Sequence, residues 1–101
     1  MHAIVRRITL PPDLSENDAR DLDHFRRVHE SRPGFIGTLE IEEDGGRRLL
    51  VNLWESREAA EAGRRTVAPL AAAHVVPHAT EPPELVAVGP VRTGLAIRAR
   101  S

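Results

Sequence analysis

The chain has 101 residues, of which 14 are basic and 15 are acidic, so its formal net charge is -1. This balance argues against a protein that binds nucleic acid or acidic membranes through a basic surface. Cysteine is absent, which excludes disulfides, thiolate metal sites, iron–sulfur clusters and a cysteine nucleophile. No apolar run approaches the roughly 18 residues of a membrane helix, and the N-terminus lacks the regions of a signal peptide. We therefore expect one small cytoplasmic domain.

Aromatic side chains are scarce, with two Phe, one Trp and no Tyr. The core must be built mainly from Leu, Ile, Val and Ala, which leaves a monomer of this size only marginally stable. We therefore expect a second copy of the chain to complete the core.

The first half of the chain predicts a strand, a helix and a second strand. Residues 2–10 form a β-branched stretch with apolar side chains on both faces, which is typical of a strand covered on both sides. Ser15 is a natural N-cap for a helix that ends near Ser31, before a Pro-Gly stop. The second strand is expected over residues 35–43.

The second half predicts a hairpin, a helix and a fourth strand. The Asp-Gly-Gly turn at 44–46 connects the second strand to an antiparallel third strand over 48–54. Ser56 caps a second helix, which we expect Pro69 to break, with a further helical turn over 70–74. A loop over 77–83 precedes a fourth strand over 85–88, and residues 91–99 keep a weak alternation.

The resulting order, β-α-β-β-α-β, predicts a ferredoxin-like α+β fold with one antiparallel sheet and both helices on one face. The single domain has its core in residues 3–88 and a C-terminal extension in 91–101. The third strand has Leu49, Val51 and Leu53 on one face and Asn52 and Trp54 on the other. We expect the leucine and valine face to meet the helices. Because the opposite face is also apolar in places, a second sheet is expected to cover it.

Two segments carry a resemblance to a known family. They are Arg-Pro-Gly-Phe-Ile-Gly at 32–37 and Leu-Trp-Glu-Ser-Arg-Glu-Ala-Ala-Glu at 53–61. Together with their spacing they resemble the antibiotic biosynthesis monooxygenase domain family, over roughly Ala3 to Val88. The resemblance implies a homodimeric α+β barrel in which two sheets pack face to face, with the helices outside and one small-molecule pocket in each subunit.

That family is functionally diverse. Some members are cofactor-free oxygenases that convert electron-rich aromatic polyketides to quinones, others degrade haem, and others have no known activity. The fold alone does not choose among them.

Asn52 and Trp54 are the first candidate site residues. We expect both to face the interior of the barrel, where the indole would be a flat wall for a planar substrate and the carboxamide would bind an oxygen. The pair resembles an Asn and a Trp in the pockets of the quinone-forming oxygenases. The alternative is that Trp54 anchors the core and Asn52 pairs with the backbone.

Arg6 and Arg7 are candidate substrate-binding residues, because an arginine on a strand covered on both faces must meet a partner, water or a ligand. We expect one of them to point into the cavity and stabilise a phenolate or enolate. The alternative is a salt bridge to Glu40 or Glu42.

His29 and His74 are candidate general bases, since histidine titrates near neutral pH. His74 and His78 are four residues apart, but Pro77 interrupts the helix that would align them, so we expect no metal site. His2, His24 and His78 are expected at the surface.

Three functional hypotheses follow. The first is a monooxygenase-like enzyme without flavin or metal, which uses O₂ as co-substrate on a small electron-rich aromatic or enolisable compound. The second is haem binding or degradation, for which His74 is the remaining candidate for an axial ligand. The third is a non-enzymatic dimer that binds a small ligand or acts as an accessory protein, an option that the scarcity of aromatics supports.

Overall fold

The computed structural model describes residues 1–92, and the C-terminal extension beyond them lies outside the described part of the chain. The elements are β1 (His2–Thr9), α1 (Glu16–Glu30), β2 (Phe35–Glu42), β3 (Arg47–Trp54), α2 (Arg57–His74) and β4 (Glu84–Pro90). Short 3-10 turns, η1 (Asp44–Gly46) and η2 (Val76–His78), follow β2 and α2. The predicted order of strands and helices is confirmed.

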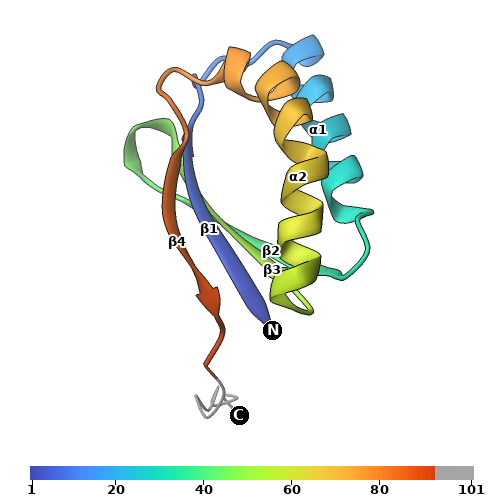
Figure 1. Ribbon diagram of the computed structural model, residues 1–101. Helices are drawn as coiled ribbons and strands as arrows, with labels where there is room; N and C mark the ends of the chain where they lie inside the picture. Colours follow the sequence, from blue (N-terminus) through green and yellow to red (C-terminus); the bar gives the residue numbers. More distant parts are fainter. Residues whose placement is uncertain (93–101) are drawn as a thin grey trace, which may run out of the picture.

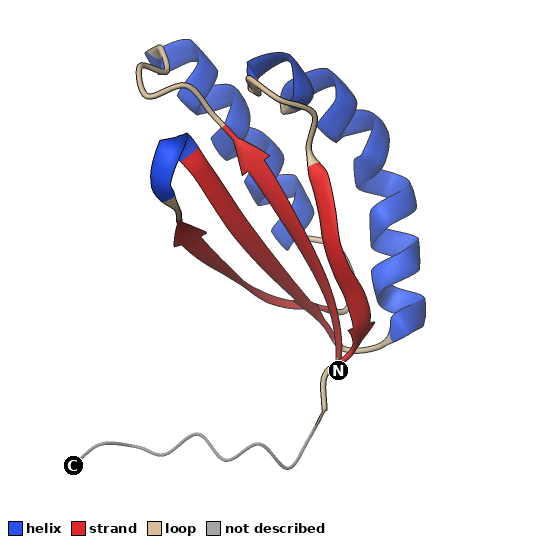
Figure 2. Cartoon of the chain, turned by 90° about the vertical axis from the view of Figure 1, so that its left-hand side faces the viewer, coloured by secondary structure: helices blue, strands red, loops and turns tan. Residues whose placement is uncertain are grey.

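The four strands form one sheet in the order β2-β3-β1-β4, and every neighbouring pair is antiparallel. Both helices lie on one side of this sheet (Figure 1). In the view from the other side, the described chain leaves the strands uncovered (Figure 2). The protein therefore has the predicted ferredoxin-like α+β fold.

Both predicted helix caps are confirmed. The Ser15 hydroxyl accepts a hydrogen bond from the Asp18 backbone N–H at 3.1 Å, and the Ser56 hydroxyl accepts one from Ala59 N–H at 3.1 Å. Gly34, between α1 and β2, has a φ of 80°, and a Cβ there would lie 2.5 Å from the Ala59 side chain. Glycine thus permits both the left-handed turn and the close approach of α2.

The prediction that Pro69 breaks the second helix is wrong, because α2 runs without interruption from Arg57 to His74. Pro69 lies on the exposed side of the helix, whereas Val67, on the sheet side, is buried. A proline removes one helical hydrogen bond. We infer that packing of the buried side of α2 against the sheet outweighs this loss, so the helix continues.

The predicted assignment of the two faces of β3 is also wrong. Asn52 and Trp54 are buried beneath the helices, whereas Leu49, Val51 and Leu53 point to the opposite face and are only half-buried. The reason lies in packing: the indole needs the deepest site, and Gly63 of α2 provides it. Alternation could not show this, since β3 is apolar on both faces.

The face of the sheet away from the helices is called the uncovered face below. Strand pairing places Leu39 beside Val51 and Ile41 beside Leu49, with Val5 on the other side of Val51. Leu39 and Ile41 expose 59% and 49% of their surface. Within residues 1–92, no helix combines the length and hydropathy needed to cross a bilayer.

Candidate functional site

A cavity of about 590 Å³ lies between the two helices and the sheet. We call it the helix–sheet cavity. Much of its wall is aliphatic and comes from both helices and the inner face of the sheet: Leu10, Leu22, Leu50, Val67, Ala71 and Val75. Among the polar side chains on its wall are Arg6, His29, Thr38, Asn52 and Arg64. An apolar cavity with a few polar groups is the usual form of a small-molecule site.

Trp54 closes the space between α2 and the sheet next to this cavity. Its side chain is 1% exposed, and its ring packs against Gly63, where a Cβ would lie 2.2 Å from the indole Cη2. The ring also contacts Phe35 edge-on, with 5.3 Å between centroids, and His29, with 5.6 Å. Trp54 therefore lies in the core behind His29, rather than on the cavity wall, and its buried Nε1 has no hydrogen-bond partner within residues 1–92.

His29 is a buried histidine on α1 that lines the cavity. Its ring lies among Phe25, Phe35 and Trp54, at centroid distances of 5.8, 5.5 and 5.6 Å. Burial in these aromatic surroundings, together with the positive charge of Arg6, lowers the pKa of His29 to about 4. The imidazole is thus neutral near pH 7 and can accept a proton.

Asn52 lines the same helix–sheet cavity as His29 rather than a space between two sheets. It is opposite Thr38 in the pairing of β2 and β3, and the Thr38 hydroxyl donates a 2.8 Å hydrogen bond to Asn52 Oδ1. This bond fixes the carboxamide and leaves its N–H groups as the donors available to a ligand. Thr38 was not predicted. The pairing of Thr38 with Asn52 across the predicted hairpin is the sequence pattern that indicates it.

Arg6 lines the helix–sheet cavity from β1, and Arg7 also borders this cavity, although two carboxylates hold the Arg7 guanidinium. Burial lowers the pKa of the Arg6 guanidinium, and the charge of Arg64 on α2 lowers it further. Arg64 also lines the cavity and was not predicted. Its position four residues after the buried Ala60 places it near the inner side of α2, which is the signal the sequence offered.

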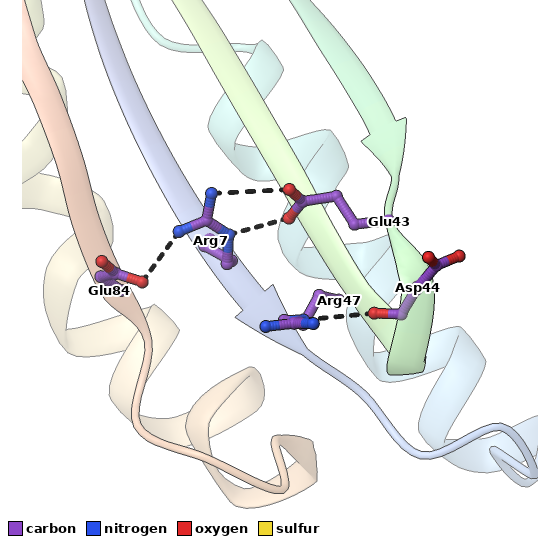
Figure 3. Close-up of polar contacts among 5 residues, drawn as sticks. All are labelled: Arg7, Glu43, Asp44, Arg47 and Glu84. Atoms are coloured by element: carbon purple, nitrogen blue, oxygen red, sulfur yellow. Dashed lines mark hydrogen bonds and ion pairs between the residues drawn. The ribbon is translucent and has the colours of Figure 1, made fainter.

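Arg7 points to the uncovered face, where two carboxylates hold its guanidinium (Figure 3). Its Nε donates to Glu43 Oε1 at 2.8 Å and its Nη1 to Glu84 Oε2 at 3.0 Å. The expected partners were Glu40 or Glu42, but Glu40 pairs with Arg48. The hydrogen bonds from Glu43 and Glu84 raise the pKa of Arg7, so this residue is the structural ion pair that the sequence analysis gave as the alternative.

His74 is placed outside the wall of the helix–sheet cavity, so the structure does not bring it together with His29. Its Nδ1 lies 2.8 Å from Asp21 Oδ1, and His78 Nε2 lies 2.8 Å from Asp21 Oδ2. These contacts join α1 to the end of α2 and to η2. They lower the pKa of Asp21, with the His78 hydrogen bond the largest cause.

The expected surface positions of the other histidines are partly wrong. His24 is exposed, but His2 is buried at 8%, and the ring of His78 is largely covered because Asp18 and Asp21 hold it. Within the described residues, no three metal-binding side chains converge.

The chain shares its architecture with solved structures described as antibiotic biosynthesis monooxygenases or putative members of that class. The resemblance inferred from the sequence is thereby confirmed at the level of fold. No protein-family model matches the sequence, and no curated protein shows significant similarity to it.

Three solved structures illustrate the likeness. Rv0793 from Mycobacterium tuberculosis superposes with a TM-score of 0.70 at 22% identity, covering 93% of this chain and 98% of the other. SnoaB, a cofactor-independent oxygenase from Streptomyces nogalater, gives 0.67 at 14% identity, covering 93% and 95%. A MhuD mutant with two manganese protoporphyrin IX groups per active site gives 0.66 at 25% identity, covering 98% and 100%.

Proposed function

We propose that this protein is a cofactor-independent, monooxygenase-like enzyme that oxidises a small electron-rich aromatic or enolisable compound in the helix–sheet cavity. One observation carries the proposal: a neutral histidine, a half-buried arginine and an oriented carboxamide meet on the wall of one largely apolar cavity. Reaction of a carbanion or phenolate with O₂ needs this combination of base, anion stabiliser and low water content.

His29 takes the proton in this mechanism. Its pKa of about 4 keeps the imidazole in the accepting form at neutral pH. A weaker base limits the driving force for proton transfer, so the surroundings must also stabilise the anion that forms. Arg6 and the Asn52 amide supply that stabilisation, because both line the same cavity and both present N–H donors.

The anion then transfers one electron to O₂, and the resulting radical and superoxide combine to form a carbon–oxygen bond. Loss of water from the hydroperoxide gives a quinone, so one O₂ yields one carbonyl oxygen and one water. O₂ is the oxidant and the substrate is the reductant. The fold relative SnoaB, described as a cofactor-independent oxygenase, supports the proposal that no resident cofactor is needed.

The test is oxygen consumption by the purified protein with several anthrone-type phenols, with quinone formation followed by absorbance. We expect uptake above buffer, an apparent pKa below the usual histidine range, and loss of at least 90% of the rate in His29→Gln. His24→Gln is the matched control, since His24 is an exposed histidine on the same helix. No uptake with any phenol would favour the non-enzymatic ligand-binding protein instead.

We also propose that the protein is a homodimer joined through the uncovered face. Leu39, Ile41 and their half-buried neighbours form an apolar surface that a monomer would leave in water. Sedimentation of the protein should give a dimer, and Ile41→Glu should give a monomer. Val76→Glu changes a similarly exposed residue of η2, which borders the helix–sheet cavity rather than the uncovered face, and should leave the dimer intact. A wild-type monomer would refute this assembly.

A further inference from the structure

Two arginines bring positive charge to the helix–sheet cavity from opposite walls. Arg6 lies on β1 and Arg64 on α2, and both line the cavity. Among residues 1–92, neither guanidinium makes an ion pair. Their charges act on each other, since Arg64 contributes to the lowered pKa of Arg6.

The acidic residues nearby are engaged by other arginines. On the cavity wall, Asp23 pairs with Arg26 and Arg27, and Glu40 pairs with Arg48.

The third acidic residue on the wall, Glu30, acts electrostatically on Arg26. On α2, the carboxylate of Glu61 accepts a 3.0 Å hydrogen bond from Arg57 Nε. Glu61 also interacts electrostatically with Arg64, although these two residues form no ion pair within residues 1–92.

The charge of the half-buried Arg6 is partly desolvated, which is costly without a counter-ion, and an anionic ligand would reduce that cost. Arg64 is exposed, so it supplies a positive charge at the solvent side of the cavity.

We propose that the ligand of the helix–sheet cavity carries a permanent carboxylate, which Arg64 binds, in addition to the oxygen that ionises during the reaction, which Arg6 binds. The inference rests on the proposed function for the oxygen that ionises during the reaction, but not for the carboxylate. Two guanidiniums match two negative charges, one from the carboxylate and one from the phenolate or enolate. Guanidinium and carboxylate also suit each other in shape, since they can form two parallel hydrogen bonds.

Arg64 is then a specificity-determining residue. The aliphatic part of the cavity wall accommodates the ring system of the ligand, and Arg64 distinguishes an aromatic acid from its neutral analogue. A hydroxy-substituted aromatic carboxylate is the substrate class that satisfies both requirements.

The experiment compares two probes by isothermal titration: 1-hydroxy-2-naphthoate, which has both groups, and 1-naphthol, which lacks the carboxylate. We expect the acid to bind at least about tenfold more tightly, as one charge-assisted pair would provide. Arg64→Gln should remove this preference while leaving naphthol binding unchanged, and Arg64→Lys should keep part of it. Arg65→Gln is the matched control, because Arg65 is the next residue on α2 and does not line the cavity.

Equal affinities for the two probes, an equal effect of Arg64→Gln and Arg65→Gln, or no binding of either probe would overturn the inference. Measurements of oxygen uptake distinguish a failure of the carboxylate proposal from a failure of the oxygenase proposal. Arg64-dependent binding of the acid without any uptake would overturn the oxygenase proposal alone. His29-dependent oxygen uptake, together with binding of the acid that Arg64→Gln does not weaken, would overturn the carboxylate alone.

Discussion

Arg6 and Arg7 are neighbours in the chain, but they occupy opposite faces of one sheet and opposite electrostatic environments. Arg7, on the uncovered face, is held by Glu43 and Glu84. Arg6, on the helix-facing side, has no ion pair among residues 1–92 and meets only further positive charge from Arg64. Within residues 1–92, Arg7 thus has carboxylate partners and Arg6 has none.

This difference indicates that the uncovered face of the sheet has a structural role, whereas the helix-facing side carries the candidate site. The ion pairs on the uncovered face serve stability, and its apolar surface is the proposed dimer interface. On the helix-facing side, the buried Asn52, the neutral His29 and Arg6, which has no ion pair within residues 1–92, depart from ordinary core composition. Departures from the local rules of folding are most often found at functional sites. The predictions below test whether the two faces differ in this way.

The largest effect on the unfolding free energy is expected at Gly63, where α2 packs against Trp54 on the helix-facing side of the sheet. In Gly63→Ala, the new Cβ would lie 2.2 Å from the Trp54 ring, so α2 or the indole must move. Overpacking of this kind costs about 1–3 kcal/mol or more of unfolding free energy. Urea denaturation of the purified variant measures the loss.

The control for Gly63 lies on the sheet. A Cβ at Gly37 meets no atom within 4 Å, so Gly37→Ala should change the unfolding free energy little. If the two variants were equally stable, the tight contact between Trp54 and α2 would be refuted.

His29 should make the stability of the helix-facing side sensitive to pH. Its pKa is about 4 in the folded protein and 6.5 as the ordinary value, so the unfolded chain takes up the proton first as pH falls. Stability is therefore lost between pH 6.5 and about 4, by roughly 2–3 kcal/mol. In His29→Leu, this part of the pH dependence should disappear, whereas His24→Leu should retain it. A titration of His29 by NMR near pH 6.5 would contradict the prediction.

Sequence patterns were sufficient for the element order and the two serine caps, because capping and turn chemistry are local. They were insufficient for the faces of β3, since Leu49 and Asn52 lie on a strand with apolar residues on both sides. Only the contact of Trp54 with Gly63, nine residues away on another element, decides which face is inside. The prediction that Pro69 breaks α2 was wrong for a similar reason, because tertiary packing overrides the local preference of proline against a helix.

The candidate site was predicted in part. Asn52 and one of the two arginines were expected in a cavity between two sheets, whereas Arg6, His29 and Asn52 line the helix–sheet cavity, and Arg64 and Thr38 were missed. Their roles depend on the register of β2 against β3 and on the rotation of α2, which no single segment encodes. His74 was misplaced because its partner, Asp21, is 53 residues earlier in the chain.

The adjacent arginines themselves give the next prediction, in which the same substitution has opposite effects. Arg6→Leu removes a partly desolvated charge without a counter-ion and should raise the unfolding free energy by about 1 kcal/mol, as is common when a functional group is removed. Arg7→Leu leaves Glu43 and Glu84 without their shared cation and should lower it. Thermal unfolding of both variants checks the signs. Two losses of stability would mean that Arg6 has a structural partner.

The smallest effect is expected at Asp21, at the other end of the helix layer from Trp54. The hydrogen bonds from His78 and His74 lower the pKa of Asp21, so the stability they provide is present above the ordinary aspartate pKa. It is lost as pH falls through the lowered pKa in the folded state. Asp21→Asn should therefore reduce the melting temperature by a few degrees at most near pH 6. The difference from wild type should vanish in strong acid, because both chains are then neutral at this position. A difference that persists unchanged at low pH would show that Asp21 acts through shape rather than charge.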